Sequence, residues 1–437
     1  MKTRIHFSAV LAFTFIALAF QSCVRDKCVR ESTFTKYSPV YMSYEELRQA
    51  VAPEAPRSLQ HPGKIYFIGS TVLINEFDKG VHVIDNADPS NPQNIAFINI
   101  PGNADMAVRG NVLYADSYID LVAIDISNPG GAREVGRAQD VFPQRVYNSG
   151  FGGDPALGVI ADWDKETVTE EMDCNMSGGW NSFEDGLMFG DNLASTGAPG
   201  PTATGFNAPG TGNREVVGMG GSMARFALVD VFLYVVDNSD LHVFNVANLH
   251  EPEKTGDVKV GFNIETIWSY GAHLFIGSQS GMHIYGVTTP GQPEFFSTYE
   301  HITSCDPVVV SGNYAYVTLR SGTPCWGFTN QLEVVDITDL RHPQLLHTFS
   351  MSNPHGLGVD GETLFICDGD QGLKVYDKTD ISKITGNLIV AYPSINAYDV
   401  IPYGGVAMMI GAHGFYQYDY SDLSNIRLLS VIPVEGL

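Results

Sequence analysis

The stretch Leu121-Val122-Ala123-Ile124-Asp125 is a short apolar run that ends in an acid, and the chain repeats it. Six further copies have an alternating apolar pattern and end in an acid, an amide or a small residue: 81–85, 241–245, 282–286, 332–336, 373–377 and 415–419. The last residues of successive copies are 40, 120, 41, 50, 41 and 42 positions apart. A recurring period of about forty residues is typical of repeat folds.

Further strand-like runs surround each copy. Two runs precede it, joined by turns such as Gly110-Asn111, Gly312-Asn313 and Gly404-Gly405, whose small residues tolerate positive φ. A turn with proline follows several copies, and then a fourth run, as at 95–100, 345–349 and 428–432. Four short antiparallel strands in roughly 40 to 45 residues is the spacing of a β-propeller blade. The sequence therefore predicts an all-β fold, a β-propeller of seven four-stranded blades within residues 59–437.

One interval of 120 positions is longer than the period by 120 − 40 = 80 residues. It predicts an insertion after the second blade, at residues 147–220, where 74 positions hold fifteen glycines, eleven acids and two bases. Loops this long within a compact domain are usually functional or disordered. We expect residues 161–172 to form a strand or a hairpin. An extra blade within the insertion is the alternative.

The strand that ends in Asp, followed by a turn with proline, resembles the motif of the LVIVD-repeat proteins. These are bacterial extracytoplasmic β-propellers that are often lipoproteins. Residues 81–85, 121–125 and 332–336 match best, whereas the copies ending at Asn245 and Gly286 lack the final Asp. The resemblance covers residues 63–433 apart from the insertion. It implies the fold but no particular chemistry, because the family as a whole has no firmly assigned activity.

The first residues predict export. Lys2 and Arg4 precede an apolar stretch at residues 7–20, which is shorter than the about 20 residues that a transmembrane helix needs. The sequence Phe20-Gln21-Ser22-Cys23 resembles the lipobox of bacterial lipoproteins. We therefore predict a signal peptide at residues 1–22, lipidation of Cys23, a tether at residues 23–58 and an envelope location. The outer membrane is favoured, on its periplasmic or surface face.

The cysteines leave two interpretations open. An ordinary signal peptide with Cys23 in a disulfide is the alternative to lipidation. Export permits disulfides, and Cys305 and Cys325 are the nearest pair in the predicted folded domain, so we predict a bridge between them.

The charge balance excludes some partners. The chain has 25 Lys and Arg against 49 Asp and Glu, a net charge of −24, and no basic cluster, so nucleic acid is not an expected partner. The sequence contains no HExxH, GxSxG or phosphate-binding glycine loop, the motifs of zinc peptidases, α/β-hydrolases and nucleotide-binding proteins.

The ligand site of a propeller is expected where the innermost strands converge at one end of the central channel. The predicted channel-mouth residues are Asp105, Arg225, Glu265, Asp306, His355 and Asp399. Carboxylates with one Arg and one His could bind a cation or a sugar, or place an acid and a base across a glycosidic bond. The alternative is a solvated mouth in which Arg225 pairs with a neighbouring acid.

Two acidic stretches contain the residue types that bind calcium. Asp162, Asp164 and Glu166 supply the oxygen ligands that Ca²⁺ prefers, although a solvated charged loop is the alternative. The loop 368–372 is similar, but a hairpin turn between the second and third strands explains it better. No other cofactor is predicted. His82, His242 and His283 share one repeat position and are predicted to be surface residues rather than a metal ring.

These observations favour a lipid-anchored module of the bacterial envelope that binds a ligand, an envelope protein or a glycan. The alternative is an enzyme, a glycan hydrolase or lyase, that uses Asp306, Asp399 and His355. A third interpretation is a purely structural scaffold.

Overall fold

A computed structural model describes residues 29–147, 151–173, 218–301, 307–322 and 329–435. The chain divides into two compact units. One contains the described residues 29–39 and 163–173, and the other contains the remaining described residues. No helix among the described residues is long and apolar enough to cross a membrane.

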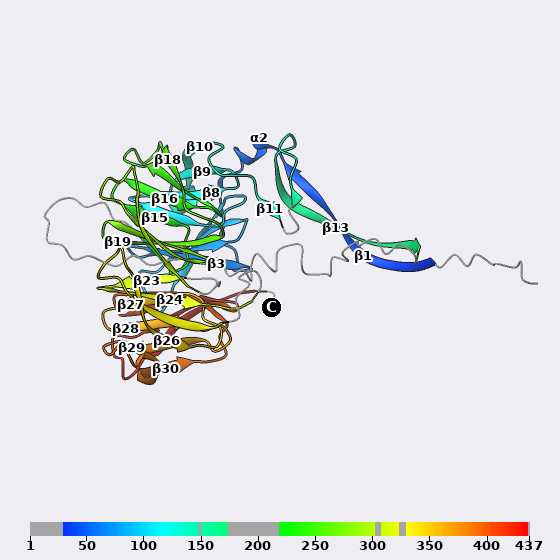
Figure 1. Cartoon of the computed structure of the whole chain (residues 1–437). Helices are drawn as coiled ribbons and strands as arrows, with labels where there is room; N and C mark the ends of the chain where they lie inside the picture. The colour runs from blue at the N-terminus through cyan, green and yellow to red at the C-terminus, as the bar shows by residue number, and fades with distance from the viewer. Residues whose placement is uncertain (1–28, 148–150, 174–217, 302–306, 323–328, 436–437) are drawn as a thin grey trace, which may run out of the picture. The chain divides into compact units, whose positions relative to one another are not determined.

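The larger unit consists of seven four-stranded antiparallel blades, which confirms the predicted fold (Figure 1). Blades 1 to 3 are β3 (Pro62–Ile68), β4 (Thr71–Glu76), β5 (Gly80–Asp85), β6 (Gln93–Asn99); β7 (Met106–Arg109), β8 (Val112–Ser117), β9 (Asp120–Asp125), β10 (Arg133–Ala138); and β15 (Phe226–Val229), β16 (Phe232–Val236), β17 (Asp240–Asn245), β18 (Glu253–Lys259).

Blades 4 to 7 follow without a further insertion. They are β19 (Ile264–Tyr270), β20 (His273–Ser278), β21 (Gly281–Gly286), β22 (Glu294–Glu300); β23 (Val308–Ser311), β24 (Tyr314–Leu319), β25 (Gln331–Asp336), β26 (Gln344–Ser350); β27 (Leu357–Asp360), β28 (Thr363–Cys367), β29 (Leu373–Asp377), β30 (Leu388–Tyr392); and β31 (Ala397–Tyr403), β32 (Val406–Gly411), β33 (Gly414–Asp419), β34 (Arg427–Pro433).

The elements outside the blades precede blade 1, lie in the insertion or join strands. Part of the segment predicted as a tether is regular structure: β1 (Val29–Met42), α2 (Tyr44–Leu47) and β2 (Ala52–Glu54), which pairs with β6. The insertion contributes β11 (Val146–Tyr147), β12 (Phe151–Gly152), β13 (Val159–Asp173) and β14 (Met219–Gly220). Residues 161–172, where we expected a strand or a hairpin, lie in the single strand β13, which pairs with β1. Two 3₁₀ turns are η1 (Pro129–Gly131) and η3 (Ile384–Asn387).

The ring closes by side-chain packing between complete blades. The inner strand β31 of blade 7 contacts β3 of blade 1. A shared apolar cluster includes Ile74 and Ile84 from blade 1 and Phe415 from blade 7. At the same seam the buried amides of Asn86 and Gln417 exchange hydrogen bonds of 2.9 and 2.7 Å. Because each polar group is satisfied by the other, the seam combines apolar burial with a specific pairing.

The structure explains why the repeated strand ends in Asp or Asn. In six blades the side chain of this residue accepts a hydrogen bond from the backbone N–H two residues later, and so forms an Asx turn that reverses the chain toward the fourth strand. The six acceptors are Asp85, Asp125, Asn245, Asp336, Asp377 and Asp419. Blade 4 has Gly286 at this position, which has no side chain for the bond.

An acid-dependent loss of stability is expected from these turns. The Asp419 carboxylate accepts bonds from the Ser421 hydroxyl and amide and from Arg427, which lower its pKa from 3.8 to about 2. The folded form therefore holds the proton less tightly than the unfolded form. The stabilisation is present above about pH 4 and is lost as the pH falls toward 2.

The variant Asp419→Asn keeps an acceptor but cannot titrate. As the pH rises from 2 to 6, the melting temperature of the wild type should increase by more than that of the variant. At pH 2 the two melting temperatures should converge. A constant difference across the range would contradict the assignment.

Two of the three repeated histidines are buried, so the surface prediction is wrong for them. His82 Nε2 lies 2.8 Å from Glu76 Oε2, and His242 Nε2 lies 3.2 Å from Asp237 Oδ2. Each acid stands at or just after the end of the second strand, next to the turn that leads to the histidine strand. The two buried histidine side chains therefore hold this turn in place by bonding to the acid beside it. His283 is half-buried and bonds to Thr298.

The loop 368–372 joins β28 to β29, as the hairpin interpretation requires. The Asp368 carboxylate accepts hydrogen bonds from the Ser352 and Asn353 amides and from Lys374 Nζ, at 2.5 Å for the last. The chain itself therefore supplies the donors for this acid.

Candidate functional site

The direction of the strands defines two ends of the ring. The first strand of each blade begins at the end that also carries the turns between second and third strands and the links from blade to blade. We call this the link end. The Asx turns lie at the opposite end. Because the insertion replaces the link from β10 to β15, it also leaves the ring at the link end.

The structure places five predicted channel-mouth residues at or near the starts of inner strands. Asp105 and Arg225 immediately precede β7 and β15, Glu265 is the second residue of β19, His355 lies two residues before β27, and Asp399 is the third residue of β31. Their role in binding stays a prediction. Asp306, the sixth residue, lies outside the described residues, as do Cys23, Cys305 and Cys325.

A buried ion pair that the sequence did not reveal joins blades 1 and 2. Lys64 Nζ, from β3, lies 3.0 Å from Asp105 Oδ2, and the side chains are only 2% and 3% exposed. The backbone amides of Arg225 and Met106 also donate to Asp105. Burial lowers the pKa of Lys64, and the carboxylate of Asp105 opposes that effect. Asp105 therefore holds three blades together rather than facing solvent.

Residues 218–224, which contain the last residues of the insertion and lead to β15, run along the inside of blade 1. We call them the axial segment. Within it β14 pairs antiparallel with β3, on the side away from β4. The Gly218 amide donates to Val108 O of blade 2 at 3.4 Å, and the Gly221 amide donates to Ile65 O at 3.3 Å. The axial segment thus covers the inner strands of blades 1 and 2.

Ser222 connects the axial segment to blades 6 and 7. The Ser222 amide and hydroxyl donate hydrogen bonds to Asp399 Oδ1 at 3.1 and 3.0 Å. The Ser222 hydroxyl oxygen also accepts a hydrogen bond from the Leu357 amide at 2.6 Å. Two glycines permit this approach. A Cβ on Gly221 or Gly356 would lie 2.1 Å from an oxygen of the Asp399 carboxyl group. Neither position could carry a side chain without moving Asp399.

Burial raises the pKa of Asp399 well above its usual range, while the Ser222 hydrogen bond opposes the shift. The carboxyl group therefore favours its neutral form in this enclosed place. Oδ1 of Asp399 is bonded to Ser222, and the two carboxyl oxygens pack against the backbone of Gly221 and Gly356. The Asp399 carboxyl group therefore holds the axial segment in place. The enzyme interpretation assigned catalysis to Asp306, Asp399 and His355, and it stays a prediction. Of these residues the structure describes Asp399, which is buried against Gly221 and Gly356, and His355.

The other half of the axis, formed by blades 3 to 6, is more open. Arg225, Glu265 and Arg320 are partly exposed there, while His355 is only 5% exposed. Burial, with a smaller contribution from Arg320, lowers the pKa of His355 to about 3, so its imidazole is neutral at neutral pH. Two hydrogen bonds fix the His355 backbone. Its amide donates to Cys367 O, and its carbonyl oxygen accepts from the Thr318 hydroxyl. Arg320, at the end of β24, was not identified from the sequence.

The two nitrogens of the His355 ring and Nε of Arg225 have no hydrogen-bond partner among the described residues. All three atoms are enclosed and have almost no exposed surface. The backbone amide of Arg225 donates to Asp105, and the pairing of its side chain with a neighbouring acid stays a prediction.

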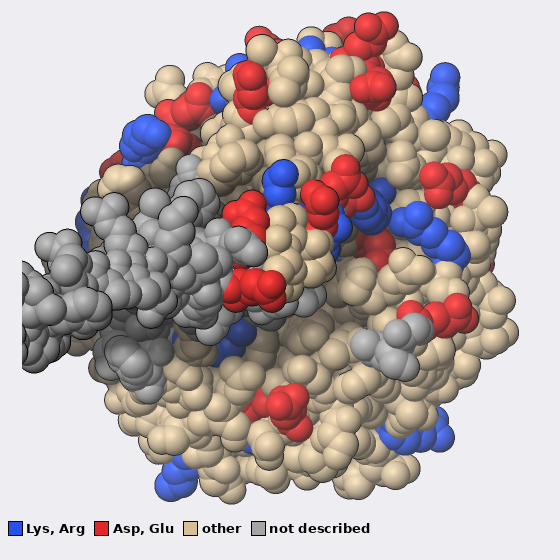
Figure 2. Space-filling model, turned by 90° about the vertical axis from the view of Figure 1, so that its right-hand side faces the viewer, with Lys and Arg blue, Asp and Glu red and all other residues tan. Residues whose placement is uncertain are grey.

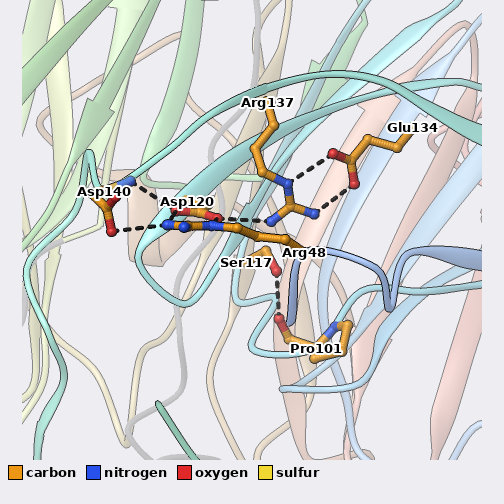
Figure 3. A network of polar contacts seen from close by, with 7 residues as sticks. All are labelled: Arg48, Pro101, Ser117, Asp120, Glu134, Arg137 and Asp140. Atoms are coloured by element: carbon orange, nitrogen blue, oxygen red, sulfur yellow. Dashed lines mark hydrogen bonds and ion pairs between the residues drawn. The ribbon is translucent and has the colours of Figure 1, made fainter. Parts of the chain in front are cut away.

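Both the chain before blade 1 and the start of the insertion are fastened to the ring. Arg48, just after α2, donates to Asp120 at 2.9 and 3.2 Å and to Asp140 at 2.9 Å (Figure 3). Arg137 reaches the same Asp120 at 3.0 Å and also binds Glu134. Burial acts to raise the pKa of Asp120, but the bonds from Arg48, the Asp140 amide and Arg137 outweigh it and lower the pKa.

Arg145 anchors the insertion next to this network. Its guanidinium donates to Asp78 and to Gly102 O and lies 4.8 Å from the centre of the Tyr118 ring. Asp162, Asp164 and Glu166, the predicted calcium ligands, are exposed at alternate positions of β13. The described residues contain no group of three or more His, Cys, Asp or Glu side chains arranged to hold a metal ion.

Charges on one face of the molecule are mixed. Figure 2 shows acidic and basic side chains interspersed, with large areas that carry neither. The excess of acids over bases does not make this face uniformly acidic.

Comparisons with known proteins agree with the blade assignment. The LVIVD repeat model matches residues 101–140 and 304–350, which contain the sequences of blades 2 and 5. No curated protein sequence matches the chain.

Three solved structures illustrate the similar folds. The computationally designed protein Ika8 is 10% identical, with a TM-score of 0.49 over 86% of this chain and 89% of that one. BamB from Moraxella catarrhalis is 10% identical, with a TM-score of 0.47 over 89% and 96%. PorZ, a surface component of the type-IX secretion system of Porphyromonas gingivalis, is 12% identical, with a TM-score of 0.47 over 88% and 40%. The chain carries LVIVD repeats, and its described residues include a seven-bladed β-propeller.

Proposed function

We propose that the protein is a lipid-anchored binding module of the bacterial cell envelope that holds a protein or glycan partner at its link end. The N-terminal sequence supports the anchor, because a short apolar stretch leads to Cys23 in a lipobox-like context. Rigid presentation of loops by a stable scaffold is a common basis of recognition, and a propeller provides such a scaffold.

The observation that carries the proposal is the double anchoring of the insertion. Its start is held by Arg145, which binds Asp78 of blade 1, and its end is the axial segment, which Ser222 joins to Asp399. A loop that served only to connect two blades would need neither attachment. Both attachments lie in the larger unit, so the ring fixes the two points from which the insertion extends at the link end.

Lipidation is tested by comparing Cys23→Ala with the matched control Cys28→Ala. In cells fed a clickable fatty acid, the wild type and Cys28→Ala should be labelled and should fractionate with membranes. Cys23→Ala should lose the label and leave the membrane fraction. Labelling of Cys23→Ala equal to the wild type would refute the anchor.

The binding face is tested with a photo-crosslinking amino acid at one position on each end of the ring. Phe262, 80% exposed, lies in the link between β18 and β19, whereas Leu423, 40% exposed, lies in an Asx turn at the opposite end. Irradiation of intact cells should give a discrete adduct from position 262 and none from position 423. Adducts from position 423 alone, or from neither position, would contradict binding at the link end.

A further inference from the structure

The strands β1 and β13 form a two-stranded ribbon, and two side-chain contacts define its register (Figure 1). The hydroxyl oxygens of Thr33 and Thr169 lie 3.0 Å apart, and Lys165 Nζ lies 5.5 Å from the centre of the Tyr37 ring. From the first contact to the second, the residue on β1 advances by four positions and the residue on β13 goes back by four. The strands are therefore antiparallel, and both contacts join residues that lie opposite each other.

In this register the first residue of β1 lies opposite the last residue of β13. Thr33 is four positions after Val29, and Thr169 is four positions before Asp173. The contact between Tyr37 and Lys165 leads to the same pair of end residues. The two strands of the ribbon therefore end together at Val29 and Asp173.

A cysteine adjoins each of these two ends in the sequence. Cys28 immediately precedes Val29, and Cys174 immediately follows Asp173. Both cysteines lie outside the described residues, so the argument rests on the strands that they adjoin. Continued by one position, the register sets the two cysteines opposite each other. Opposite residues of antiparallel strands have Cα atoms about 4.5–5.5 Å apart, within the about 4.4–6.8 Å that a disulfide spans.

The other cysteines leave these two as a pair. The chain has six cysteines. Cys23 is predicted to carry the lipid, and Cys305 and Cys325 are predicted to bond to each other. Cys367 is free and fully buried at the end of β28.

We propose that Cys28 and Cys174 form a disulfide that joins β1 to β13 at the paired ends of the ribbon. A sheet of only two strands is at best marginally stable in water, and a covalent link between the strands limits their separation. The bond needs an oxidising compartment, so in cells it rests on the export that the proposed function includes.

The oxidant is a disulfide-bonded thiol oxidase of the envelope. One cysteine thiolate attacks the disulfide of the oxidase and forms a mixed disulfide, which releases one sulfur of the oxidase as a thiolate. The second cysteine thiolate attacks the sulfur of the first and displaces the other sulfur of the oxidase. The two cysteines together lose two electrons and two protons, and the oxidase becomes a dithiol.

The first test does not depend on export. The purified, folded protein is reduced, oxidised with glutathione disulfide, alkylated under denaturing conditions and digested with trypsin. Mass spectrometry should find peptide 28–30 linked to peptide 166–214, each of which contains a single cysteine. If Cys28 and Cys174 both carry glutathione or the alkylating reagent, or if either is linked to another cysteine, the proposal is wrong.

The same digestion of protein isolated from cells without reduction separates this inference from the proposed function. The linked peptides should again be present. A link that forms with glutathione disulfide but is absent from the protein isolated from cells would contradict export, while it would support the pairing that the register indicates.

A variant adds a readout of the ribbon itself. Cys28→Ser should leave the Cys174 thiol open to alkylation, whereas the control Cys367→Ala should retain the linked peptides. In hydrogen exchange, peptides within residues 31–39 and 163–170 should exchange faster in oxidised Cys28→Ser than in the oxidised wild type, and β24 should be unchanged. Equal exchange of the ribbon in the two proteins would contradict a bond that restrains it.

Discussion

Replacing Lys64 with methionine should destabilise the protein by about 3–5 kcal/mol, the usual cost of removing one member of a buried ion pair. Lys64 Nζ is 3.0 Å from Asp105 Oδ2, and neither side chain is more than 3% exposed. Methionine retains most of the volume, so the loss comes from the uncompensated charge on Asp105. The midpoint of urea unfolding, followed by tryptophan fluorescence, measures the effect.

The double variant Lys64→Met/Asp105→Asn distinguishes charge from packing. Asparagine is neutral and still offers an oxygen to the amides of Arg225 and Met106, which donate to Asp105 in the wild type. We expect the double variant to be more stable than Lys64→Met alone, by an energy that a double-mutant cycle quantifies. An unchanged midpoint in Lys64→Met would show that the pair is not buried as described.

The second large effect is expected from a single added methyl group. A Cβ on Gly356 would lie 2.1 Å from Asp399 Oδ1 and 2.9 Å from the Ser222 hydroxyl oxygen. Gly356→Ala must therefore displace the carboxyl group, the axial segment or both. Overpacking of this kind costs about 1–3 kcal/mol, and here it also breaks the bonds of Ser222.

Gly256→Ala is the matched control, because no atom lies within 4 Å of a Cβ at that position in β18. It should be neutral or slightly stabilising, since alanine reduces the freedom of the unfolded chain. Adding Asp399→Ala to Gly356→Ala removes the clashing carboxyl group and should restore part of the lost melting temperature. If Gly356→Ala melts at the same temperature as Gly256→Ala, the packing around Asp399 is not as described.

The repeated strand determined how much of the fold could be predicted. Each Asp or Asn that ends a third strand is a local feature, because its partner is an amide two residues away, as in Asp419 and Ser421. Such local pairs recur at a fixed period, so the sequence reveals both the blades and the interruption between blades 2 and 3. The strand at residues 161–172 was also predicted, but its partner β1 was not, because the two are far apart in the chain.

The axis was harder to predict, because its contacts join distant residues. Ser222 and Asp399 are 177 positions apart, and the glycines around Ser222 are typical of the whole insertion. Only closure of the ring brings blades 1, 6 and 7 to the axial segment. Lys64 could have been noticed as a charge within an otherwise apolar strand. The burial of His82 could have been expected from Glu76 on the adjoining strand.

The axial segment packs as part of the ring, and native-state hydrogen exchange of the wild type tests this placement. Amides of the axial segment bond to Ile65 O, to Val108 O and to the Asp399 side chain, and most of the segment is buried. We predict that peptides covering residues 218–224 exchange as slowly as those covering β3. Exchange of residues 218–224 within seconds, beside a protected β3, would show that the axial segment is not part of the ring.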